Sequence, residues 1–516
     1  MDAPGGGVVK RDYSGVWILV ATILGSSMAF IDGTAVNVAL PIMQDDFGAS
    51  LADLQWVISG YGLFLASLLL VAGALGDRLG RRRTFIWGIA VFAGASVWAG
   101  FAPNVEQLIV ARAVQGIGGA LFIPGSLALI GACFTDKERG PALGTWAAAS
   151  GLTSAAGPLL GGFLAETLSW RWVFFINIPI AVIVIAIAIM RVPESRDDTA
   201  EGRIDYLGGL LATLGLGGIV YGLIASANDG FSDPVVITTL AGGVFGMIAF
   251  IVTEIKVAHP MMPLGVFKSR SFSGANFLTL LLYSGLGGAI FFLPLNLVQV
   301  QGYSATEAGA AMLPFLLSIG FLSRYTGGLV TRIGAKWPLA AGTAITGLGF
   351  VLFALTEMED SYWTSFFPAV TAFGLGMALT IAPLVTVVMG TVDPRLSGLA
   401  SGINNAVTRT GFLMAVAVFG IVALAFFSSS LDERLDDIGA SPAVVEFLDD
   451  ERLKLAGAEL PPGLSAADSA AVQGAIDGAF VEAFQNVMWI AAAMAFLSAL
   501  VALVAIEGRP KPPSTA

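Results

Sequence analysis

The most informative segment of this sequence is Gly73-Ala-Leu-Gly-Asp-Arg-Leu-Gly-Arg-Arg-Arg83, a glycine-rich and charged segment between two long apolar runs. A related segment, Gly328-Leu-Val-Thr-Arg-Ile-Gly-Ala-Lys336, lies much later in the chain and has Thr331 where the first segment has Asp77. We expect each segment to follow the second helix of a six-helix unit, because membrane proteins built from duplicated halves show such weak internal repeats. The pair therefore predicts two similar halves.

The composition places most of the chain in lipid. Charged residues make up only 12% of its 516 residues and hydrophobic residues 56%, and the mean hydropathy is +0.82, whereas soluble domains carry roughly 25% charged residues. At about 20 apolar residues per crossing, the apolar runs predict about fourteen membrane-spanning helices. The 64 glycines favour a closely packed bundle, since small residues let helices approach one another in lipid. We therefore expect an all-α membrane protein.

The sequence lacks the residue sets on which several classes of function depend. The single Cys133 and the single His259 cannot form an intrachain disulfide or complete a structural metal site, so no metal is expected. A Gly-x-x-x-x-Gly-Lys-Ser/Thr phosphate-binding loop and a histidine-based catalytic pair are absent from the sequence, which argues against an enzyme or an ATP-driven pump. The arginine clusters lie between apolar runs, where membrane topology explains them, so no nucleic-acid partner is expected.

Charged residues indicate the orientation of the helices. Basic residues fall in alternate loops, and the loops between them carry mostly acidic residues, with Arg171 as the exception. Since basic loops stay in the cytoplasm, both termini are expected there. The first apolar run, after Lys10 and Arg11, is about 25 residues long, which is too long for a signal-peptide core. We expect it to remain as the first crossing of a multi-pass protein of the cell (inner) membrane.

The expected organisation is two halves with an extra pair of helices between them. Residues 1–14 form a cytoplasmic N-terminus, 15–192 the N-terminal six-helix half, 193–257 two additional central helices, 258–506 the C-terminal six-helix half and 507–516 a cytoplasmic C-terminus. Within the second half, residues 428–480 are strongly acidic and far more polar than a crossing. This segment is either an external hairpin or cap, or a solvated and poorly ordered external loop.

Residues 73–83 resemble the cytoplasmic loop signature of the major facilitator superfamily, Gly-x-Leu-x-Asp-Arg-x-Gly-Arg. The resemblance implies the major facilitator fold and a conformational latch, in which an aspartate accepts hydrogen bonds and pairs with arginines to hold the halves together in one state. Anchoring by positive charge alone would explain the arginines but not the aspartate. Thr331 in the second copy predicts a weaker latch there. The latch residues are Gly73, Asp77, Arg78, Gly80 and Arg81.

Three further motifs resemble the drug exporters of the same superfamily. Arg112-Ala-Val-Gln-Gly-Ile-Gly-Gly119 resembles their Arg-x-x-Gln-Gly-x-Gly pattern, and Ile31-Asp-Gly-Thr-Ala-Val-Asn-Val-Ala-Leu-Pro41 is close to a motif typical of fourteen-helix drug:proton antiporters. Residues 151–162 resemble the antiporter signature, in which glycines and a proline kink a helix and permit close packing, although Thr153 replaces a usual glycine and generic small-residue packing is the alternative. The antiporter residues are Gly151, Gly157, Pro158, Gly161 and Gly162.

Asp32 and Arg112 are the candidate proton-coupling residues. Ionisable residues within membrane-spanning helices usually face the bundle interior or an aqueous cavity, and they mark functional sites. Burial favours a neutral carboxyl and a nearby guanidinium favours a charged one, so the approach or separation of the two groups could couple proton uptake to conformation. The alternatives are that Asp32 makes only a packing hydrogen bond and that Arg112 reaches out to the membrane surface.

The resemblance implies a secondary active transporter that exports amphipathic or lipophilic small molecules, as in multidrug efflux, in exchange for protons. The proton-motive force would supply the energy without any cofactor, and a monomer surrounded by membrane lipid would suffice. The alternative is a specific exporter of a single lipid or metabolite that uses the same proton-coupled alternating-access mechanism. A channel would instead show uncoupled conductance, and a receptor would show binding without turnover.

The substrate cavity is expected between the two halves. The sparse charge favours lipophilic monocations, neutral amphiphiles or lipid-like molecules, although Arg112 and Arg409 leave room for anions. The candidate lining residues are Trp56, Tyr61, Gln115, Trp146, Tyr283, Phe291, Asn296, Phe315, Asn404, Asn405 and Arg409.

Overall fold

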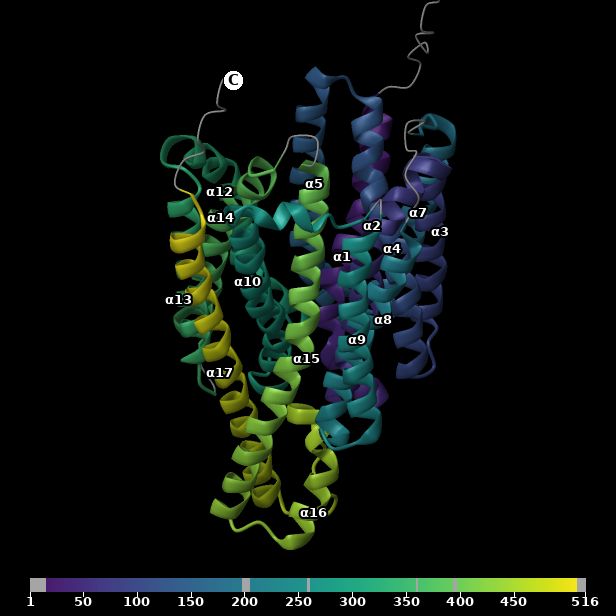
Figure 1. Ribbon diagram of the computed structural model, residues 1–516. Helices are drawn as coiled ribbons and strands as arrows, with labels where there is room; N and C mark the ends of the chain where they lie inside the picture. Colours follow the sequence, from purple (N-terminus) through teal and green to yellow (C-terminus); the bar gives the residue numbers. More distant parts are fainter. Residues whose placement is uncertain (1–14, 197–204, 258–259, 359–360, 393–396, 508–516) are drawn as a thin grey trace, which may run out of the picture.

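The computed structural model describes residues 15–196, 205–257, 260–358, 361–392 and 397–507. Every regular element in these residues is a helix, and the long helices run roughly along one common direction (Figure 1). The prediction of an all-α fold is therefore confirmed. The predicted N-terminal segment 1–14 and nearly all of the predicted C-terminal segment 507–516 lie outside the described residues.

The first seven helices form one bundle, drawn from purple to blue in Figure 1. The short α6 and the longer α7 follow one another through Ile176 and together are long enough for one crossing. This junction places Asn177 at the start of α7. The helices are α1 (Gly15–Phe47), α2 (Leu51–Leu79), α3 (Arg81–Gly100), α4 (Val105–Cys133), α5 (Asp136–Thr167), α6 (Trp172–Phe175) and α7 (Asn177–Arg191).

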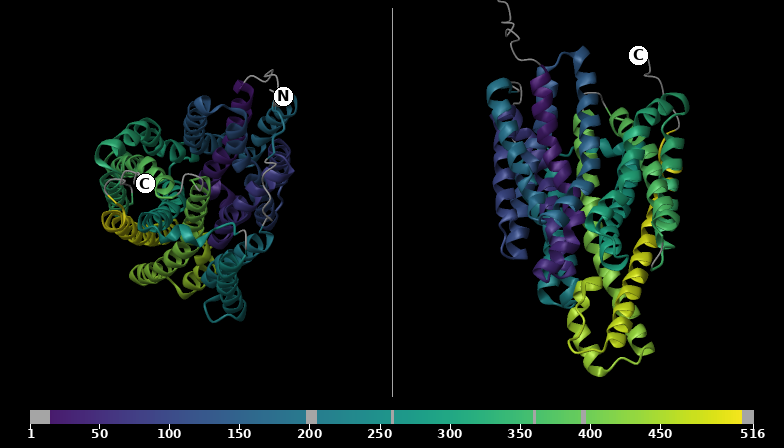
Figure 2. Two further views of the ribbon diagram at one scale, coloured as in Figure 1. Left: turned by 45° about the horizontal axis from the view of Figure 1, so that its top comes forward. Right: turned by 180° about the vertical axis from the view of Figure 1, so that it is seen from behind.

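The C-terminal helices form a second bundle beside the first, drawn from teal to yellow in Figures 1 and 2. Short 3₁₀ helices at Leu264–Lys268 and Arg452–Gly457 and π-helical turns at Asn296–Val300 and Tyr362–Phe366 interrupt its long helices. The helices are α10 (Arg270–Leu295), α11 (Ala305–Ala311), α12 (Leu313–Ile333), α13 (Lys336–Ala354), α14 (Phe367–Gly390), α15 (Ser397–Asp437), α16 (Pro442–Glu451) and α17 (Ala466–Ala505).

Two helices, α8 (Tyr206–Asp229) and α9 (Pro234–Lys256), lie between the bundles in sequence. They pack closely against each other because glycines of one helix face glycines of the other, as Gly215 faces Gly246. In addition, α8 contacts both α2 and α15. The central pair therefore covers one side of the junction between the two halves.

Twelve helices within the described residues are long and apolar enough to cross a membrane. The α3 and α5 helices, 20 and 32 residues long, are not among these twelve, but each packs alongside them, α3 on α4 and α5 on α1. With these two the bundle would contain the predicted fourteen crossings, a count that stays a prediction.

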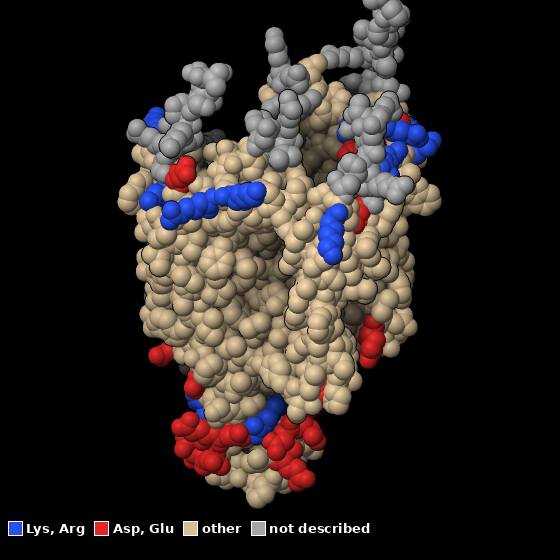
Figure 3. All heavy atoms as spheres, in the orientation of Figure 1, with Lys and Arg blue, Asp and Glu red and all other residues tan. Residues whose placement is uncertain are grey.

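Charge separates the two ends of the molecule (Figure 3). Lysine and arginine gather at the end where α1 begins and α17 ends, which we call the basic end. Acidic side chains crowd the opposite, acidic end, with a few basic residues among them. Arg171, the exception in the charge pattern, is neutralised by an ion pair of 3.0 Å with Asp46. The alternation predicted from the loops is therefore present in three dimensions.

The acidic segment 428–480 forms a helical cap rather than a poorly ordered loop. It consists of the ends of α15 and α17, the α16 helix and the 3₁₀ helix Arg452–Gly457. Arg452 joins two of these elements, because it pairs with Asp432 of α15 and, at 2.7 Å, with Asp449 of α16. Apolar residues at helical spacing are buried beneath the charged surface, among them Leu431, Leu435, Leu448, Ile476 and Phe480.

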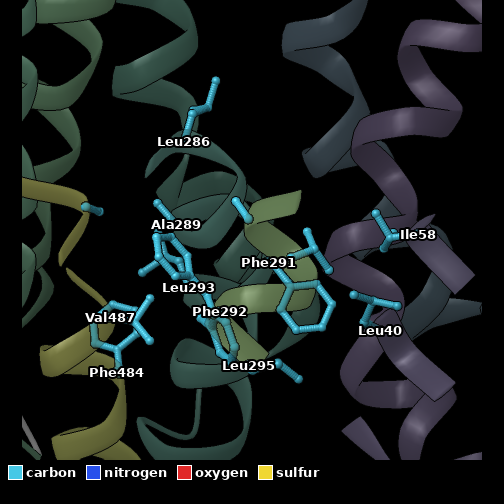
Figure 4. Packing of buried hydrophobic residues seen from close by; sticks show 14 of the residues in the cluster. Leu40, Ile58, Leu286, Ala289, Phe291, Phe292, Leu293, Leu295, Phe484 and Val487 are labelled. Atoms are coloured by element: carbon cyan, nitrogen blue, oxygen red, sulfur yellow. The ribbon is translucent and has the colours of Figure 1, made fainter. Parts of the chain in front are cut away.

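The apolar core continues across the junction between the halves. Figure 4 shows Phe291 of α10 directed toward Leu40 of α1, close to Ile58 of α2. All three residues belong to one buried cluster. Since bulky apolar side chains fill this level of the junction, the two halves are in firm contact between the middle of the bundle and the acidic end.

Candidate functional site

Asp32 lies in the middle of α1 and is fully buried. Its Oδ2 accepts a hydrogen bond from Nη1 of Arg112 on α4, so the two side chains form an ion pair. Its Oδ1 accepts from Nε2 of Gln115 at 3.2 Å and from Nδ2 of Asn177 at 3.3 Å. The carboxylate is therefore held by side chains from α4 and α7.

Arg112 is held by partners from several helices. Its Nε donates to the carbonyl oxygen of Val57 on α2 at 3.1 Å, and Nη1 also donates to Oε1 of Gln115 at 2.8 Å. The guanidinium carbon lies 4.5 Å from the ring centre of Tyr61 and 5.8 Å from that of Phe174, within the range of cation–π attraction. A side chain that is 1% exposed does not reach the membrane surface, so the alternative placement of Arg112 is wrong.

Two further residues complete this polar cluster, and the sequence analysis assigned no role to either. The hydroxyl of Ser96 on α3 accepts from Gln115 at 2.8 Å and from Asn177 at 3.4 Å. Both Ser96 and Asn177 are fully buried. Five helices, α1, α2, α3, α4 and α7, thus contribute to one hydrogen-bonded network, which fixes the ion pair because buried polar groups are costly unless they are satisfied.

A cavity of about 280 Å³ lies against this cluster. Arg112 is part of its wall, so the ion pair lies directly behind the cavity surface. The α1, α2, α4 and α5 helices line one side, and α10 and α15 line the other. The cavity is therefore at the junction of the two halves, as the sequence predicted. Its wall consists of Ala29, Phe30, Gly33, Thr34, Ile58, Tyr61, Gly62, Arg112, Ile123, Ser154, Tyr283, Leu286, Asn405, Thr408, Arg409, Phe412 and Leu413.

Some of the predicted lining residues do face this cavity. Tyr61, Tyr283, Asn405 and Arg409 belong to its wall. A second cavity of about 210 Å³ shares Tyr283 and Asn405 with the first and adds Asn404, whose Nδ2 donates to Thr279 at 2.9 Å. Because the second cavity lies between α10, α14 and the first turns of α15, it extends the space toward the basic end.

Other predicted lining residues are placed elsewhere. Phe291 fills the core between the halves, and Phe315 is stacked on Phe373 at 4.7 Å between ring centres. Trp56 packs on Tyr221 of α8, and Asn296 is buried in the π-helical turn after α10. These side chains are absent from the cavity walls because aromatic and amide groups serve helix packing equally well.

Gln115 and Trp146 support the cavity wall without forming it. Gln115 belongs to the buried polar cluster with Asp32. The indole Nε1 of Trp146 donates to Oγ of Ser26 at 3.1 Å, and its ring packs edge-on against Phe30, which is itself a wall residue. Both residues therefore act on the cavity through their neighbours.

The predicted latch residues form a compact corner between α2 and α3 at the basic end. Asp77 pairs with Arg81 at 2.7 Å, and the turn between them passes through Gly80, whose φ is +110°. The carboxylate of Glu194, after α7, accepts from the backbone N–H of Arg82 at 3.0 Å. The predicted pairing of the aspartate with arginine is present, but these contacts all lie within the N-terminal half. The side chain of Thr331, in the second copy, lies outside what the structure describes.

The antiporter segment of α5 packs with its glycines against both halves. A side chain at Gly157 or Gly161 would collide with Thr34 or Ala35 of α1, and one at Gly162 would collide with the backbone of Ala305 on α11. The close packing expected of the motif is thus present at these three positions, because only glycine admits such approach. Pro158 lies in the same contact, because its backbone is packed closely against Gly309 of α11. Gly151 faces open space instead.

Hydrogen bonds between the two halves lie toward the acidic end. Gln55 of α2 donates to the carbonyl oxygen of Val416 on α15. Gln299 donates to Oε1 of Gln44 at 2.9 Å. Near these bonds, Glu166 of α5 accepts from the backbone N–H of Thr306 at 3.0 Å. Within the described residues, the cavity is therefore closed toward the acidic end.

Comparison with known proteins identifies the family. The sequence model described as Major Facilitator Superfamily matches residues 22–416. The chain belongs to the major facilitator superfamily. Among curated relatives in this superfamily, it is 34% identical over 424 residues to the multidrug resistance protein Stp of Mycobacterium tuberculosis, covering 81% of this chain and 78% of that protein. It is 30% identical over 503 residues to the tetracenomycin C resistance and export protein of Streptomyces glaucescens, covering 95% and 92%.

Solved structures of superfamily transporters share the fold. A bacterial homolog of the human lysosomal transporter Spinster, in an inward-facing and unoccupied conformation, aligns with a TM-score of 0.62 at 20% identity, covering 98% of this chain and 100% of that chain. A POT family transporter in complex with 5-aminolevulinic acid aligns with a TM-score of 0.64 at 12% identity, covering 97% of each. The major facilitator fold follows from the family and these structures, and a multi-pass membrane transporter follows from the family, the curated relatives and the helices.

Proposed function

We propose that this superfamily member exports amphipathic, drug-like small molecules across the cell (inner) membrane in exchange for protons. The relatives support export of this kind, since their names include multidrug resistance, puromycin resistance and tetracenomycin C export. The basic end would face the cytoplasm and carry both termini, because basic loops stay on that side. The protein would act as a monomer, with the proton-motive force as its energy source and no cofactor.

The observation that carries the proposal is the buried Asp32–Arg112 pair behind the cavity wall. A carboxylate at this depth is tolerated in two forms, paired with a cation or neutralised by a proton. Because Arg112 also lines the cavity, a bound molecule can reach the guanidinium that neutralises the carboxylate. Substrate binding and protonation of Asp32 are thereby linked at one residue.

A transport cycle follows from this link. When the acidic end opens, a proton from outside binds Asp32 and frees Arg112, and the molecule in the cavity leaves. After the acidic end closes, the proton leaves toward the basic end and the pair re-forms, as it stands in this structure. Each proton that moves inward releases about 2.3 kcal/mol per 100 mV of membrane potential.

The test is pH-driven uptake of puromycin and lincomycin, compounds named for two of the relatives, into proteoliposomes with an acidic lumen. A difference of one pH unit supplies about 1.4 kcal/mol per proton, enough for an about tenfold accumulation at one-for-one exchange. Uptake is corrected for protein-free liposomes. We expect transport by the natural protein and none by Asp32→Asn, whereas Asp229→Asn, at the exposed end of α8, transports normally.

The outcomes separate the alternatives. Transport of both compounds supports multidrug export, and transport of one compound alone supports a specific exporter. Uptake that is the same with and without the pH gradient contradicts the proposal, and so does uptake by Asp32→Asn at the rate of the natural protein.

A further inference from the structure

Arg409 is a second arginine in the wall of the cavity, and its surroundings differ from those of Arg112. It comes from α15, so it faces the cavity from the C-terminal half. Within the part of the chain that the structure describes, Arg112 has an ion pair and three hydrogen bonds to O atoms, whereas Arg409 has neither an ion pair nor a hydrogen bond. The five N–H donors of its guanidinium therefore have no hydrogen-bond partner among the described residues.

The charges around the cavity do not balance. Among the described residues, its wall contains two arginines and no aspartate or glutamate. The charge of Arg112 is matched by Asp32 directly behind it, and both oxygens of that carboxylate are already occupied by Arg112, Gln115 and Asn177. Arg409 thus leaves the cavity with one uncompensated positive charge, which is costly within a membrane-spanning bundle unless a counter-charge is supplied.

The rest of the wall suits a molecule with one polar end. Apolar side chains form much of the surface, including Phe30, Ile58, Leu286, Phe412 and Leu413. Hydroxyl and amide groups are provided by Thr34, Tyr61, Ser154, Tyr283, Asn405 and Thr408. An apolar surface with a few convergent polar groups is typical of small-molecule sites.

We propose that Arg409 binds the anionic group of the transported molecule, so that the preferred substrate is an amphipathic organic monoanion. The guanidinium forms paired hydrogen bonds with a carboxylate or sulfonate, which a neutral or cationic analogue cannot accept in the same way. The apolar wall holds the remainder of the molecule. This inference rests on the proposed export function and narrows its substrate class. The sequence alone favoured lipophilic monocations, neutral amphiphiles or lipid-like molecules and left room for anions.

The experiment compares three probes with the same aromatic body: anthracene-9-carboxylate, 9-anthracenemethanol and 9-(aminomethyl)anthracene. Binding is measured by titration calorimetry with the full chain in phosphatidylcholine nanodiscs at neutral pH, corrected for empty nanodiscs. The natural protein should bind the carboxylate about tenfold to a hundredfold more tightly than the alcohol, and the amine most weakly. Arg409→Gln should remove this preference, and Arg409→Lys should keep part of it, because lysine retains the charge but not the planar donors.

The controls keep the result interpretable. Binding of the neutral alcohol should change by less than about twofold in Arg409→Gln, which reports an intact cavity. Arg191→Gln removes an arginine from the exposed end of α7 and should bind all three probes as the natural protein does. Added phosphatidylglycerol should not displace anthracene-9-carboxylate from the protein. If it does so in a way that depends on Arg409, the ligand of Arg409 is an anionic lipid headgroup, and the substrate assignment is overturned.

Failure of this inference is distinct from failure of the proposed function. Equal binding of the three probes, no binding of any of them, or unchanged carboxylate binding in Arg409→Gln overturns the anion site, while pH-driven uptake that requires Asp32 would still stand. Carboxylate binding that depends on Arg409, together with no pH-driven uptake of any compound, would leave the anion site in place and contradict proton-coupled export.

Discussion

Arg112 and Asp32 form an ion pair in which the side chains are 1% and 0% exposed, so neither charge is solvated by bulk water. Removing one partner leaves the other charge buried and unpaired. We therefore expect Arg112→Gln to lower the free energy of unfolding by about 3–5 kcal/mol. The double variant Asp32→Asn/Arg112→Gln contains no unpaired charge and should recover much of this loss.

Thermal unfolding in nanodiscs measures the stability of four proteins: the natural protein, Asp32→Asn, Arg112→Gln and the double variant. Arg191→Gln serves as the matched control, since Arg191 is exposed, and its effect should stay within about 0.5 kcal/mol. A double variant as unstable as the sum of the two single variants would show that the pair is not energetically coupled.

Gly162 of α5 lies against the backbone of Ala305, which belongs to the other half. The added methyl group of Gly162→Ala would collide with that carbonyl and force the halves apart at the acidic end. We expect the free energy of unfolding to fall by about 1–3 kcal/mol, which is typical of overpacking, and pH-driven uptake to fall as well. Gly151→Ala is the control in the same motif, because the new methyl group would meet no described atom within 4 Å outside the adjoining backbone of its own helix. Similar losses in both variants would contradict the assignment of the contact.

Gly80 has φ +110° in the turn between Asp77 and Arg81, a conformation that residues with a β-carbon rarely adopt. A β-carbon there would also lie 2.7 Å from the carboxylate of Glu194. Gly80→Ala should therefore lower the free energy of unfolding by about 1–3 kcal/mol and disturb the bond from Arg82 to Glu194. Gly76→Ala, where the nearest atom would be 3.9 Å away, should be tolerated. The free energy of unfolding and pH-driven uptake are measured for Gly80→Ala and Gly76→Ala. If the two variants behave equally, the turn does not require glycine at position 80.

The sequence predicted the ionisable part of the site better than its neutral part. Asp32 and Arg112 were identified because charged residues are rare in apolar runs, and the structure brings them together. Ser96 and Asn177 carried no such signal, since neutral polar residues occur throughout the helices and only tertiary packing decides which of them meet.

The aromatic residues and the acidic segment also show that tertiary packing could not be predicted from the sequence. Phe291 and Tyr283 both lie on α10, yet one fills the core and the other faces the cavity. Which face of a helix meets the partner half depends on how the halves pack, and helical spacing alone does not determine this packing. In the acidic segment, the charge pattern left an ordered cap and a loop equally open, and the structure decides between them by burying apolar residues such as Leu431 and Leu435 beneath the charges.

Gln44 connects the helical cap to the junction between the halves. Its Nε2 donates to the carbonyl oxygen of Lys454 in the cap at 2.9 Å, and its Oε1 accepts from Gln299 of the C-terminal half at 2.9 Å. Gln44 itself is 3% exposed, so Gln44→Leu would place an apolar group against two partly buried polar groups and remove the hydrogen bond of each. The closed state of the acidic end should lose about 1–3 kcal/mol, which corresponds to a shift of about fivefold to 150-fold toward the open state.

The shift can be measured with a single cysteine in the cavity wall, Ser154→Cys, in a chain whose natural cysteine is replaced by Cys133→Ser. A membrane-impermeant maleimide added at the acidic end should label this cysteine about tenfold faster in Gln44→Leu than in the parent. Gln473→Leu is the matched control, because among the described residues the side chain of Gln473 donates only to Asp477 of its own helix, at 2.8 Å. This variant should label at the parent rate. If Gln44→Leu and Gln473→Leu label equally, Gln44 does not hold the acidic end closed, and the cap would have no part in gating the cavity.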